Sequence, residues 1–417
     1  MNHPASHRQS IVAVLDIGTT KIACMIARPD KETGFEVLGI GHQLSKGIKS
    51  GVITDIAEAN TSIRAALHAA ETMAGLTVED VMVSVNGSHL KSRNVTVDLD
   101  ILADGVSDRD VLDIIHEGSR SMQTEDTTIV HCFPAYYTID ATRGIRDPRG
   151  MVGKKLGAEL QVVAAKSVYL QNLNKCLAGA HLNVSEYVMS SHASALSVLE
   201  PDEMDLGVTL IDMGGGVTSI SVFAGGRNIY SDTIPIGGNH VTSDIAQGLS
   251  TSVQVAERLK TLYGNAINSV KDTDVLIDVP QLGDSEDDDE PVRMPRAMLV
   301  GVIRPRMEEI FEMVRAKLES SGVNKIAGRR CVITGGASQM LGVGDLAERM
   351  LAKQVRKGKP NLFPGTAEAI AGPAFASVVG MLHYAQKRPW EEALLTAEHA
   401  RRRFIPERLR NWLRENF

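Results

Sequence analysis

Short apolar runs, separated by polar turns, dominate the beginning of the chain. Three of them have the length and the β-branched content of consecutive strands: Ile11–Asp16, Ile22–Arg28 and Phe35–Gly41. The period then changes to that of a helix, which Asp55 caps and which continues to about Ala74 before Gly75 ends it. Val81–Val85 is the next predicted strand. Residues 10–85 are therefore expected to begin an α/β unit.

A different pattern follows, in residues 86–166. It contains one predicted helix, near Asp108–Ser121, and three strand-like pieces: Asn94–Leu99, Tyr136–Asp140 and Gln161–Ala165. We interpret this block as a small inserted α/β subdomain. The first unit resumes in residues 167–205, where the pattern predicts a helix, a strand and a second helix at Val168–Ala180, Ser185–Met189 and Ala193–Leu199.

The second half of the chain repeats the opening order of an apolar strand, a glycine turn and a second strand. Val208–Asp212 and Ser219–Ala224 form the predicted hairpin, and Cys331–Thr334 is a further buried strand. Helices are predicted at Asp244–Tyr263 and Met298–Ser320. We therefore expect one unit from residues 206–240 and 330–387, and another from residues 241–329.

Composition narrows the class of protein. The chain has 417 residues, 43% of them hydrophobic and 4% aromatic, which favours an aliphatic α/β core divided among several subdomains. The net charge of −7 gives no reason to expect a nucleic-acid partner. The four cysteines lack CxxC spacing and are expected to be reduced thiols.

The sequence predicts neither a secretory signal nor a membrane-spanning helix. The polar segment Met1–Ser10 lacks the apolar core of a secretory signal, and the apolar stretch Ala371–Leu382 is too short to span a membrane. The acidic run Asp284–Glu290 is expected to be a solvated loop.

The candidate chemistry lies in two similar turns. Asp16-Ile17-Gly18-Thr19-Thr20-Lys21 and Asp212-Met213-Gly214-Gly215-Gly216-Val217-Thr218 each place a carboxylate at a strand end before glycines and hydroxyl groups. Glycine lets backbone N–H groups approach phosphate oxygens, and the hydroxyls of Thr19, Thr20 and Thr218 and the charge of Lys21 add donors. Asp16 and Asp212 are candidate Mg²⁺ ligands, acting through the water shell of the ion.

A third glycine turn strengthens this interpretation. Thr334-Gly335-Gly336-Ala337-Ser338 follows a buried strand and precedes a predicted helix, so its backbone can lie against an adenine. Each turn alone is more often an ordinary hairpin, whereas the three in this order predict an ATP site with Gly18, Gly214, Gly215, Gly216, Gly335, Gly336 and Ala337 around the nucleotide.

In this order the three turns resemble those of the actin, sugar-kinase and heat-shock-chaperone ATPase superfamily. The resemblance to the FtsA family of bacterial division proteins is closer, and it is carried by Lys46–Gly51, Gly144–Pro148, Ile234–Thr242 and Ile303–Arg306. It implies an actin-like fold of two related lobes, with a subdomain called IC at residues 86–166. It also implies that Glu257 and Lys260 contact the adenosine, and that Gly238 and Gln339 complete the nucleotide site. Without the resemblance, Glu257 and Lys260 would be an ordinary charged helix face.

The sequence gives little sign of fast hydrolysis. Actin-like relatives place Gln or Glu on the helix before the second turn, whereas Ser190–Ser194 contains no acid and no amide. His192 is the one candidate base there, although a plain helix-start residue is the favoured interpretation. We expect an ATP-binding switch with slow turnover.

The last residues have an amphipathic pattern. A polar linker at residues 388–403 precedes a predicted helix at 404–417, with Ile405, Leu409, Trp412, Leu413 and Phe417 on one arc and Arg408, Arg410 and Arg414 on the other side. Such a helix lies in a lipid interface with its arginines over anionic headgroups. Docking on the protein itself or on a partner is the alternative. FtsA-type proteins end in a membrane-targeting helix of this kind.

The resemblance also implies partners. FtsA-type proteins bind the acidic C-terminal peptide of the tubulin-like protein FtsZ on subdomain IIB, where Arg293, Arg296, Arg304 and Arg306 are candidate contacts. They tether FtsZ filaments to the inner face of the cytoplasmic membrane at the division site, polymerise head to tail and meet other division proteins. Three alternatives stay open: a small-molecule kinase of the same fold, an FtsA-like adaptor of type IV pili and a shape-determining actin homologue.

Overall fold

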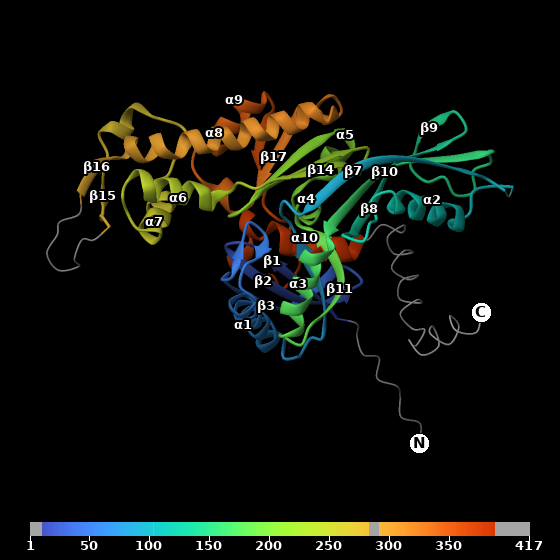
Figure 1. The fold of residues 1–417 in the computed structure, drawn as a ribbon, viewed down its shortest axis with the longest axis horizontal. Helices are drawn as coiled ribbons and strands as arrows, with labels where there is room; N and C mark the ends of the chain where they lie inside the picture. Colours follow the sequence, from blue (N-terminus) through green and yellow to red (C-terminus); the bar gives the residue numbers. More distant parts are fainter. Residues whose placement is uncertain (1–10, 103, 283–291, 388–417) are drawn as a thin grey trace, which may run out of the picture.

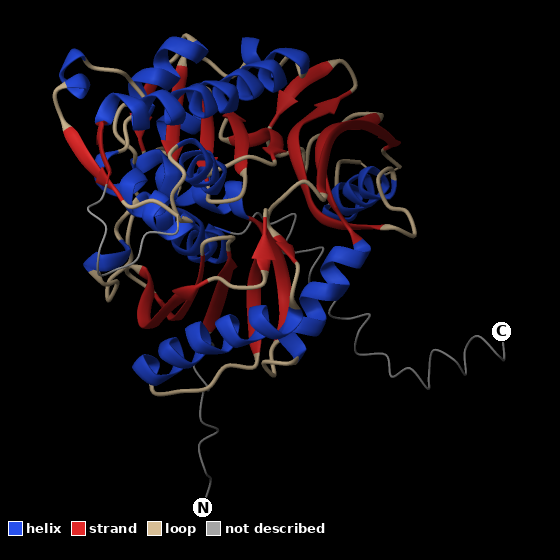
Figure 2. Cartoon of the chain, turned by 60° about the vertical axis from the view of Figure 1, so that its left-hand side comes forward, coloured by secondary structure: helices blue, strands red, loops and turns tan. Residues whose placement is uncertain are grey.

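The structure is a computed structural model that describes residues 11–102, 104–282 and 292–387. Two five-stranded sheets form the centre of the molecule, and we call each sheet with its covering helices a lobe (Figures 1 and 2). Two smaller parts lie at opposite ends of the longest axis (Figure 1). The predicted acidic loop, polar linker and amphipathic C-terminal helix lie outside the described residues.

Lobe I is built on a sheet with the strand order β11-β6-β1-β2-β3. Its strands are β1 (Val12–Ile17), β2 (Lys21–Asp30), β3 (Gly34–Leu44), β6 (Asp80–Val85) and β11 (Asn183–Met189). Alternate residues of β1 point to opposite faces, so Leu15 packs on helices α1 (Ile56–Ala74) and α3 (Ser167–Ala178), while Val14 packs on α10 (Ala376–Lys387). Both faces of the sheet are therefore covered.

Lobe II repeats this plan with the strand order β14-β13-β12-β17-β18. Its strands are β12 (Val208–Met213), β13 (Thr218–Ala224), β14 (Arg227–Ile234), β17 (Arg330–Thr334) and β18 (Gln354–Lys357). In both lobes the opening hairpin is antiparallel and a parallel strand joins its first member, β6 beside β1 and β17 beside β12. The duplication expected from the two turns extends to the order of the sheets.

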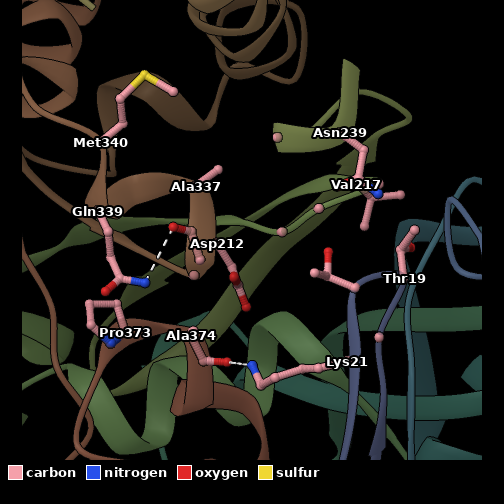
Figure 3. Close-up of a pocket in the computed structure, with 18 of the residues that line it drawn as sticks. Thr19, Lys21, Asp212, Val217, Asn239, Ala337, Gln339, Met340, Pro373 and Ala374 are labelled. Carbon is pink, nitrogen blue, oxygen red and sulfur yellow. Dashed lines mark hydrogen bonds between the residues drawn. The ribbon is translucent and has the colours of Figure 1, made fainter. Parts of the chain in front are cut away.

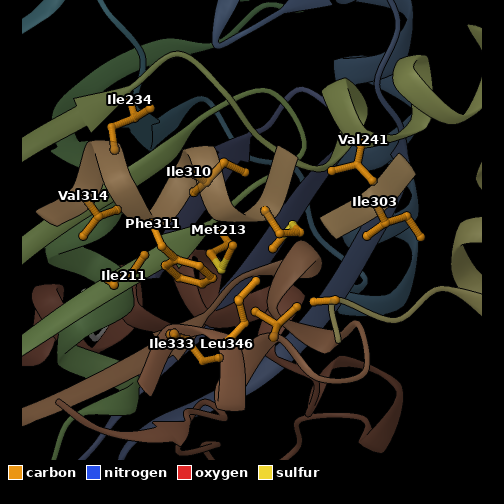
Figure 4. Packing of buried hydrophobic residues seen from close by; sticks show 14 of the residues in the cluster. Ile211, Met213, Ile234, Val241, Ile303, Ile310, Phe311, Val314, Ile333 and Leu346 are labelled. Carbon is orange, nitrogen blue, oxygen red and sulfur yellow. The ribbon is translucent and has the colours of Figure 1, made fainter. Parts of the chain in front are cut away.

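One face of the second sheet carries the largest apolar cluster of the described residues. Ile310, Phe311 and Val314 of α8 (Arg296–Ser320) pack on Ile211 and Ile333 of the sheet (Figure 4). Helix α9 (Val343–Leu351) covers the same face. Helix α8 also contacts α6 (Gly238–Gly248), α7 (Val253–Tyr263) and the short hairpin β15 (Leu276–Val279)–β16 (Val292–Pro295).

Helix α4 (Ser190–Val198) is wedged between the two sheets. Its Ala193 packs with lobe I, whereas Ala195 and Val198 pack with lobe II. Helix α10 lies against α4 and against the first sheet. The sequence-based division placed residues 330–387 in the second unit, so the structure differs for α10, because its apolar face matches the free face of β1 and β2.

The inserted block is a separate layer. Strands β7 (Leu90–Asp100), β10 (Lys155–Lys166), β8 (Thr127–Ile139) and β9 (Thr142–Ile145) form a sheet in that order, covered by α2 (Asp108–Arg120). Val111, Ile114 and Ile115 of α2 pack on this sheet. The lone predicted helix of the block is present, and its strands are longer than the sequence pattern indicated.

Two expected helices end differently. The predicted helix at Asp244–Tyr263 is two helices, because the chain turns at Ser250, whose φ is +51°, before Ser252 caps α7. The third glycine turn enters a short 3₁₀ helix, η3 (Gly336–Gln339), and α9 begins only at Val343. The sequence pattern did not predict strands β14 and β18 or the short hairpins. All four cysteines are buried, and none of them forms a disulfide.

Candidate nucleotide site between the two lobes

The two glycine turns have the same backbone geometry. The N–H of Gly18 donates to Lys21 O at 3.0 Å, and the N–H of Gly214 donates to Val217 O at 2.9 Å. Each bond closes the hairpin that follows an aspartate-bearing strand. A Cβ added at Gly216 would lie 2.5 Å from Thr19 Oγ1, so the tips of the two turns almost touch. The turns therefore face each other from opposite lobes.

The two strand-end carboxylates are held by serines of the intervening helices. Ser377 of α10 donates to Asp16 Oδ1 at 2.9 Å, and Ser194 of α4 donates to Asp212 Oδ2 at 2.6 Å. Burial, reinforced by the charge of Asp16, raises the pKa of Asp212 to about 6, although the Ser194 bond opposes the shift. Two carboxylates facing one cavity are the oxygen donors that Mg²⁺ prefers, so the residues fit this ion.

Lys21 lies deep at the base of the site. Its ammonium group donates to the carbonyl of Ala374 and lies 4.2 Å from the centre of the Phe375 ring (Figure 3). Burial lowers the pKa of Lys21, while the charges of Asp16 and Asp212 act in the opposite direction. A partly buried cation beside two glycine turns is suited to an anionic ligand.

A cavity of about 420 Å³ separates the lobes at this point. Its lining includes most of the predicted nucleotide-site residues: Asp16, Gly18, Thr19, Thr20, Lys21, Asp212, Gly214, Gly215, Gly216, Gly238, Glu257, Lys260, Gly335, Gly336, Ala337 and Gln339. Figure 3 shows Thr19 and Val217 at one side of it and Gln339 and Met340 at the other. Residues from five separate parts of the sequence thus meet around one space.

Thr218 is the exception. It is fully buried, and its hydroxyl donates to Ile236 O at 2.8 Å instead of lining the cavity. Thr218 is the first residue of β13, where it pairs with Ile234 of β14. Successive side chains of a strand point to opposite faces, and at this position the side chain points away from the cavity. Its hydroxyl secures the Ile234–Thr242 stretch behind the second turn, where Gly238 N–H donates to Gly214 O at 2.9 Å.

The far end of the cavity is lined by α6, α7, α8 and η3. Lys260 Nζ donates to Glu257 Oε2 at 2.6 Å and to Thr242 Oγ1 at 2.8 Å, so the two charged residues singled out in the sequence belong to one network. Gly335 has a φ of +84°, and a Cβ there would lie 2.4 Å from Asp212 Oδ1. Glycine at this position lets the third turn approach the second carboxylate closely.

The candidate base is elsewhere. His192 is buried among Phe133, Phe223 and Tyr384, and its Nδ1 lies 3.2 Å from Asn228 Nδ2. It is not among the residues that line the cavity. His192 lies in the first turn of α4, which agrees with the favoured interpretation of a plain helix-start residue.

Asn86 is one of several cavity residues that the sequence pattern did not indicate, and Asn239 and Ser377 are others. It follows β6, about a hundred residues before α4, and it lies beside Ser190, with Asn86 Nδ2 donating to Ser190 Oγ at 3.3 Å. Ser190–Ser194, where actin-like relatives place an amide or an acid, contains neither. Parallel pairing of β6 with β11 brings the ends of the two strands together, so this strand order was the signal needed to find Asn86.

The four candidate partner arginines differ in exposure and in partners. Arg293 is 74% exposed beside Asp278, and Arg304 pairs with Glu308 on its own helix. Arg296 bonds Tyr263 O and lies 3.5 Å from Asp272, while Arg306 makes bonds of 2.6 and 2.9 Å to Asp244. Arg296 and Arg306 thus hold α8 to its neighbours, and Arg293 is the freest of the four.

The part of the chain that the structure describes contains no helix that is long and apolar enough to cross a membrane. The predicted membrane-binding residues 404–417 lie outside that part.

Comparison with known proteins agrees with this geometry. Residues 209–380 match the family model described as cell division protein FtsA, and residues 87–164 match the model described as the SHS2 domain inserted in FtsA. The second match coincides closely with the inserted sheet and its helix.

Curated relatives resemble the chain along almost its whole length. A cell division protein FtsA of Rhizobium meliloti is 40% identical over 99% of this chain and 96% of its own. The FtsA of Pseudomonas aeruginosa is 32% identical over 98% of both chains. That of Escherichia coli K12 is 29% identical over 98% of this chain and 99% of its own.

Solved structures show the fold. A chain of the PilM–PilN type IV pilus biogenesis complex aligns with a TM-score of 0.66 at 16% identity, over 91% of this chain and 100% of its own. MreB5 of Spiroplasma citri bound to ADP aligns with a TM-score of 0.55 at 13% identity, over 92% and 98% of the two chains. The chain has the actin-like ATPase fold that the resemblance implied.

Proposed function

Because the chain belongs to the FtsA family of cell division proteins, we propose that it is an ATP-binding protein that polymerises on the membrane and tethers FtsZ filaments there. The observation that carries the nucleotide part is the meeting of Asp16, Lys21 and Asp212 in one cavity between matched turns. The proposals of polymerisation, membrane binding and FtsZ tethering rest on family membership and on the surface of the molecule.

The cavity supports a definite orientation of ATP. The triphosphate would lie between the two turns, with Mg²⁺ near Asp16 and Asp212, and the adenosine near Glu257, Lys260 and η3. Asp16 and Asp212 would orient the water shell of the ion, and Mg²⁺ would neutralise part of the phosphate charge. Lys21 would meet the phosphates only after its ammonium exchanges some of its contact with Ala374.

Calorimetry with ATP and Mg²⁺ tests this part directly. We expect saturable binding by the full chain and weaker binding by Asp212→Asn. No measurable affinity of the full chain for ATP would contradict the proposal at its centre.

Two surfaces support assembly and partner binding. The inserted subdomain and the β15–β16 hairpin lie at opposite ends of the molecule, so a contact between them can repeat without closing (Figure 1). On the hairpin, Leu276 is 59% exposed, and it lies on the same face as Arg293. An acidic peptide with an apolar anchor, such as the FtsZ tail, would suit this face.

The partner face has a matched test. Arg293→Glu should weaken binding of the FtsZ C-terminal peptide, measured by fluorescence anisotropy, whereas Arg109→Glu on the exposed side of α2 should not. The double reversal of Arg304 and Arg306 is a poorer choice, because it also breaks the Arg306–Asp244 pair. Unchanged affinity of Arg293→Glu would remove this residue from the proposed contact.

The membrane part is tested by deletion. Removal of residues 404–417 should abolish co-sedimentation with anionic vesicles while leaving ATP affinity unchanged. Retained vesicle binding would contradict the membrane assignment. Electron microscopy of the full chain on anionic lipid, with ATP and then with FtsZ filaments, tests filament formation and tethering together.

A further inference from the structure

Asn86 occupies a distinctive place in the cavity. It comes from the end of β6 in lobe I, and Ser190 beside it comes from the start of α4. The adenosine end of the cavity is instead lined by α6, α7, α8 and η3. A nucleotide with its base at that end would direct its terminal phosphate toward Asn86.

The amide of Asn86 is held close to both phosphate turns. A Cβ added at Gly51 would lie 2.3 Å from Asn86 Oδ1, so the amide packs against the backbone of Gly51. The N–H of Gly51 donates to Thr19 Oγ1 at 3.1 Å in the first turn. Thr19 in turn lies against Gly216 of the second turn. Asn86 is therefore connected to the tips of both turns through neighbouring groups.

One half of the amide is satisfied and the other is not. Nδ2 donates to Ser190 Oγ at 3.3 Å, and that hydroxyl lies 3.4 Å from Val85 O. Oδ1 is shielded from solvent and has no hydrogen-bond partner among the described residues. A buried carbonyl oxygen without a partner is unfavourable, so a rearrangement that uncovers Oδ1 and gives it a donor when the site is filled is favoured.

We propose that Asn86 is a positioning residue for ATP hydrolysis: when the filled site shifts the Gly51 backbone away from Oδ1, this oxygen accepts a hydrogen bond from the water that attacks the terminal phosphate. This inference rests on the proposed ATP-binding function. In the reaction, the water oxygen bonds to the γ-phosphorus as the bond to the β–γ bridging oxygen breaks, which gives ADP and inorganic phosphate. The proton of the water passes to phosphate oxygen or solvent. An amide does not take that proton at neutral pH, which agrees with the slow turnover that we expect.

Asn239 is the competing amide, because it also lines the cavity. It belongs to lobe II, where its N–H donates to Gly215 O at 2.7 Å, behind the second turn. That placement suits support of the second turn, whereas Asn86 lies in lobe I. Comparing Asn86→Ala with Asn239→Ala separates the two candidates.

The experiment uses the full chain and three readouts. Calorimetry gives affinities for ADP alone and for ADP with aluminium fluoride. The fluoride complex mimics the phosphoryl group in the transition state, with a water bound at the attacking position. Single-turnover hydrolysis of γ-labelled ATP gives the chemical step. Thermal unfolding without nucleotide reports folding. Asn94→Ala, a change at an exposed amide of the inserted sheet, is the control.

For Asn86→Ala we expect about a tenfold or greater loss in single-turnover rate and in affinity for ADP with aluminium fluoride, from the loss of one water-orienting bond. Affinity for ADP alone should stay within about twofold, since the amide does not face the adenosine end. Asn94→Ala should match the unmodified chain.

Three outcomes would overturn the inference. They are an unchanged rate in Asn86→Ala, an equal loss of affinity for ADP alone, and binding of ATP by the unmodified chain without any hydrolysis. Failure of the unmodified chain to bind ATP would instead overturn the proposed function, so the two failures are distinguishable.

Discussion

The Ser194 hydroxyl of α4 donates a 2.6 Å hydrogen bond to Asp212, the strand-end carboxylate of lobe II. Helix α4 lies between the two sheets, so this bond connects the second phosphate turn to the packing of both lobes. Ser377 of α10 makes the matching bond to Asp16 at 2.9 Å. Because α4 and α10 pack on each other, a shift between the lobes would move both carboxylates.

The carboxyl of Asp212 makes stability depend on pH. Burial raises its pKa from the ordinary value of 3.8 to about 6. Between these values the folded chain retains a proton that the unfolded chain has released, so rising pH should lower the free energy of unfolding without nucleotide. Urea titrations at pH 4 to 7 should show that Asp212→Asn has a shallower decline than the unmodified chain.

Ser194→Ala should have the opposite effect on the same titration. The Ser194 bond lowers the pKa of Asp212, so its removal should extend the decline to higher pH. Superimposable pH profiles for all three chains would show that Asp212 does not titrate in this range.

Lys21→Ala should weaken ATP binding strongly. A charge-assisted hydrogen bond contributes about 1.5–3 kcal/mol, which corresponds to a rise in Kd of about 10- to 150-fold. Isothermal titration calorimetry measures the effect. Lys49→Ala is the control, because Lys49 is exposed and does not line the cavity. Equal affinities of the two variants would place the phosphates elsewhere.

Gly216→Ala should destabilise the packing of the second turn against lobe I. The added Cβ would meet Thr19 Oγ1 at 2.5 Å and Ser50 Cα at 2.7 Å, and Ser50 is backbone that has to move. Overpacking of this kind costs about 1–3 kcal/mol, so thermal unfolding should begin at a lower temperature and ATP affinity should fall. Gly344→Ala in α9 meets nothing within 4 Å and should not destabilise the chain.

Arg227 fixes the inserted subdomain to lobe II. Its guanidinium donates to Pro134 O at 2.9 Å and to Arg146 O at 2.6 Å, and Arg146 itself pairs with Asp205 at 2.9 Å. Arg227→Ala should therefore speed hydrogen exchange in β8 and β9 by about tenfold or more, because bonds from a charged group contribute about 1.5–3 kcal/mol each.

Mass spectrometry of exchanged peptides measures this change. Arg109→Ala, which affects only a pair on the exposed side of α2, should leave the exchange of β8 and β9 as it was. Protection that survives in Arg227→Ala would show that apolar packing alone holds the subdomain.

Local sequence determined the strands and turns that carry the candidate site. The short apolar runs of β1 and β12, with aspartate at the strand end and glycine after it, were sufficient to predict both hairpins and their duplication. Strands and tight turns depend mainly on residues that are neighbours in the chain, so they can be predicted from the local sequence pattern. The inserted block was recognisable for the same reason, because its pattern differs from that on either side.

Tertiary structure decided which distant residues share the cavity. Asn86 meets Ser190 only through the pairing of β6 with β11, and Thr218 turns from the cavity because β14 pairs beside it. Helix α10 joins lobe I although the chain reaches it from lobe II. Side-chain direction at a strand end and the choice of neighbouring strand depend on long-range packing, which no local pattern encodes.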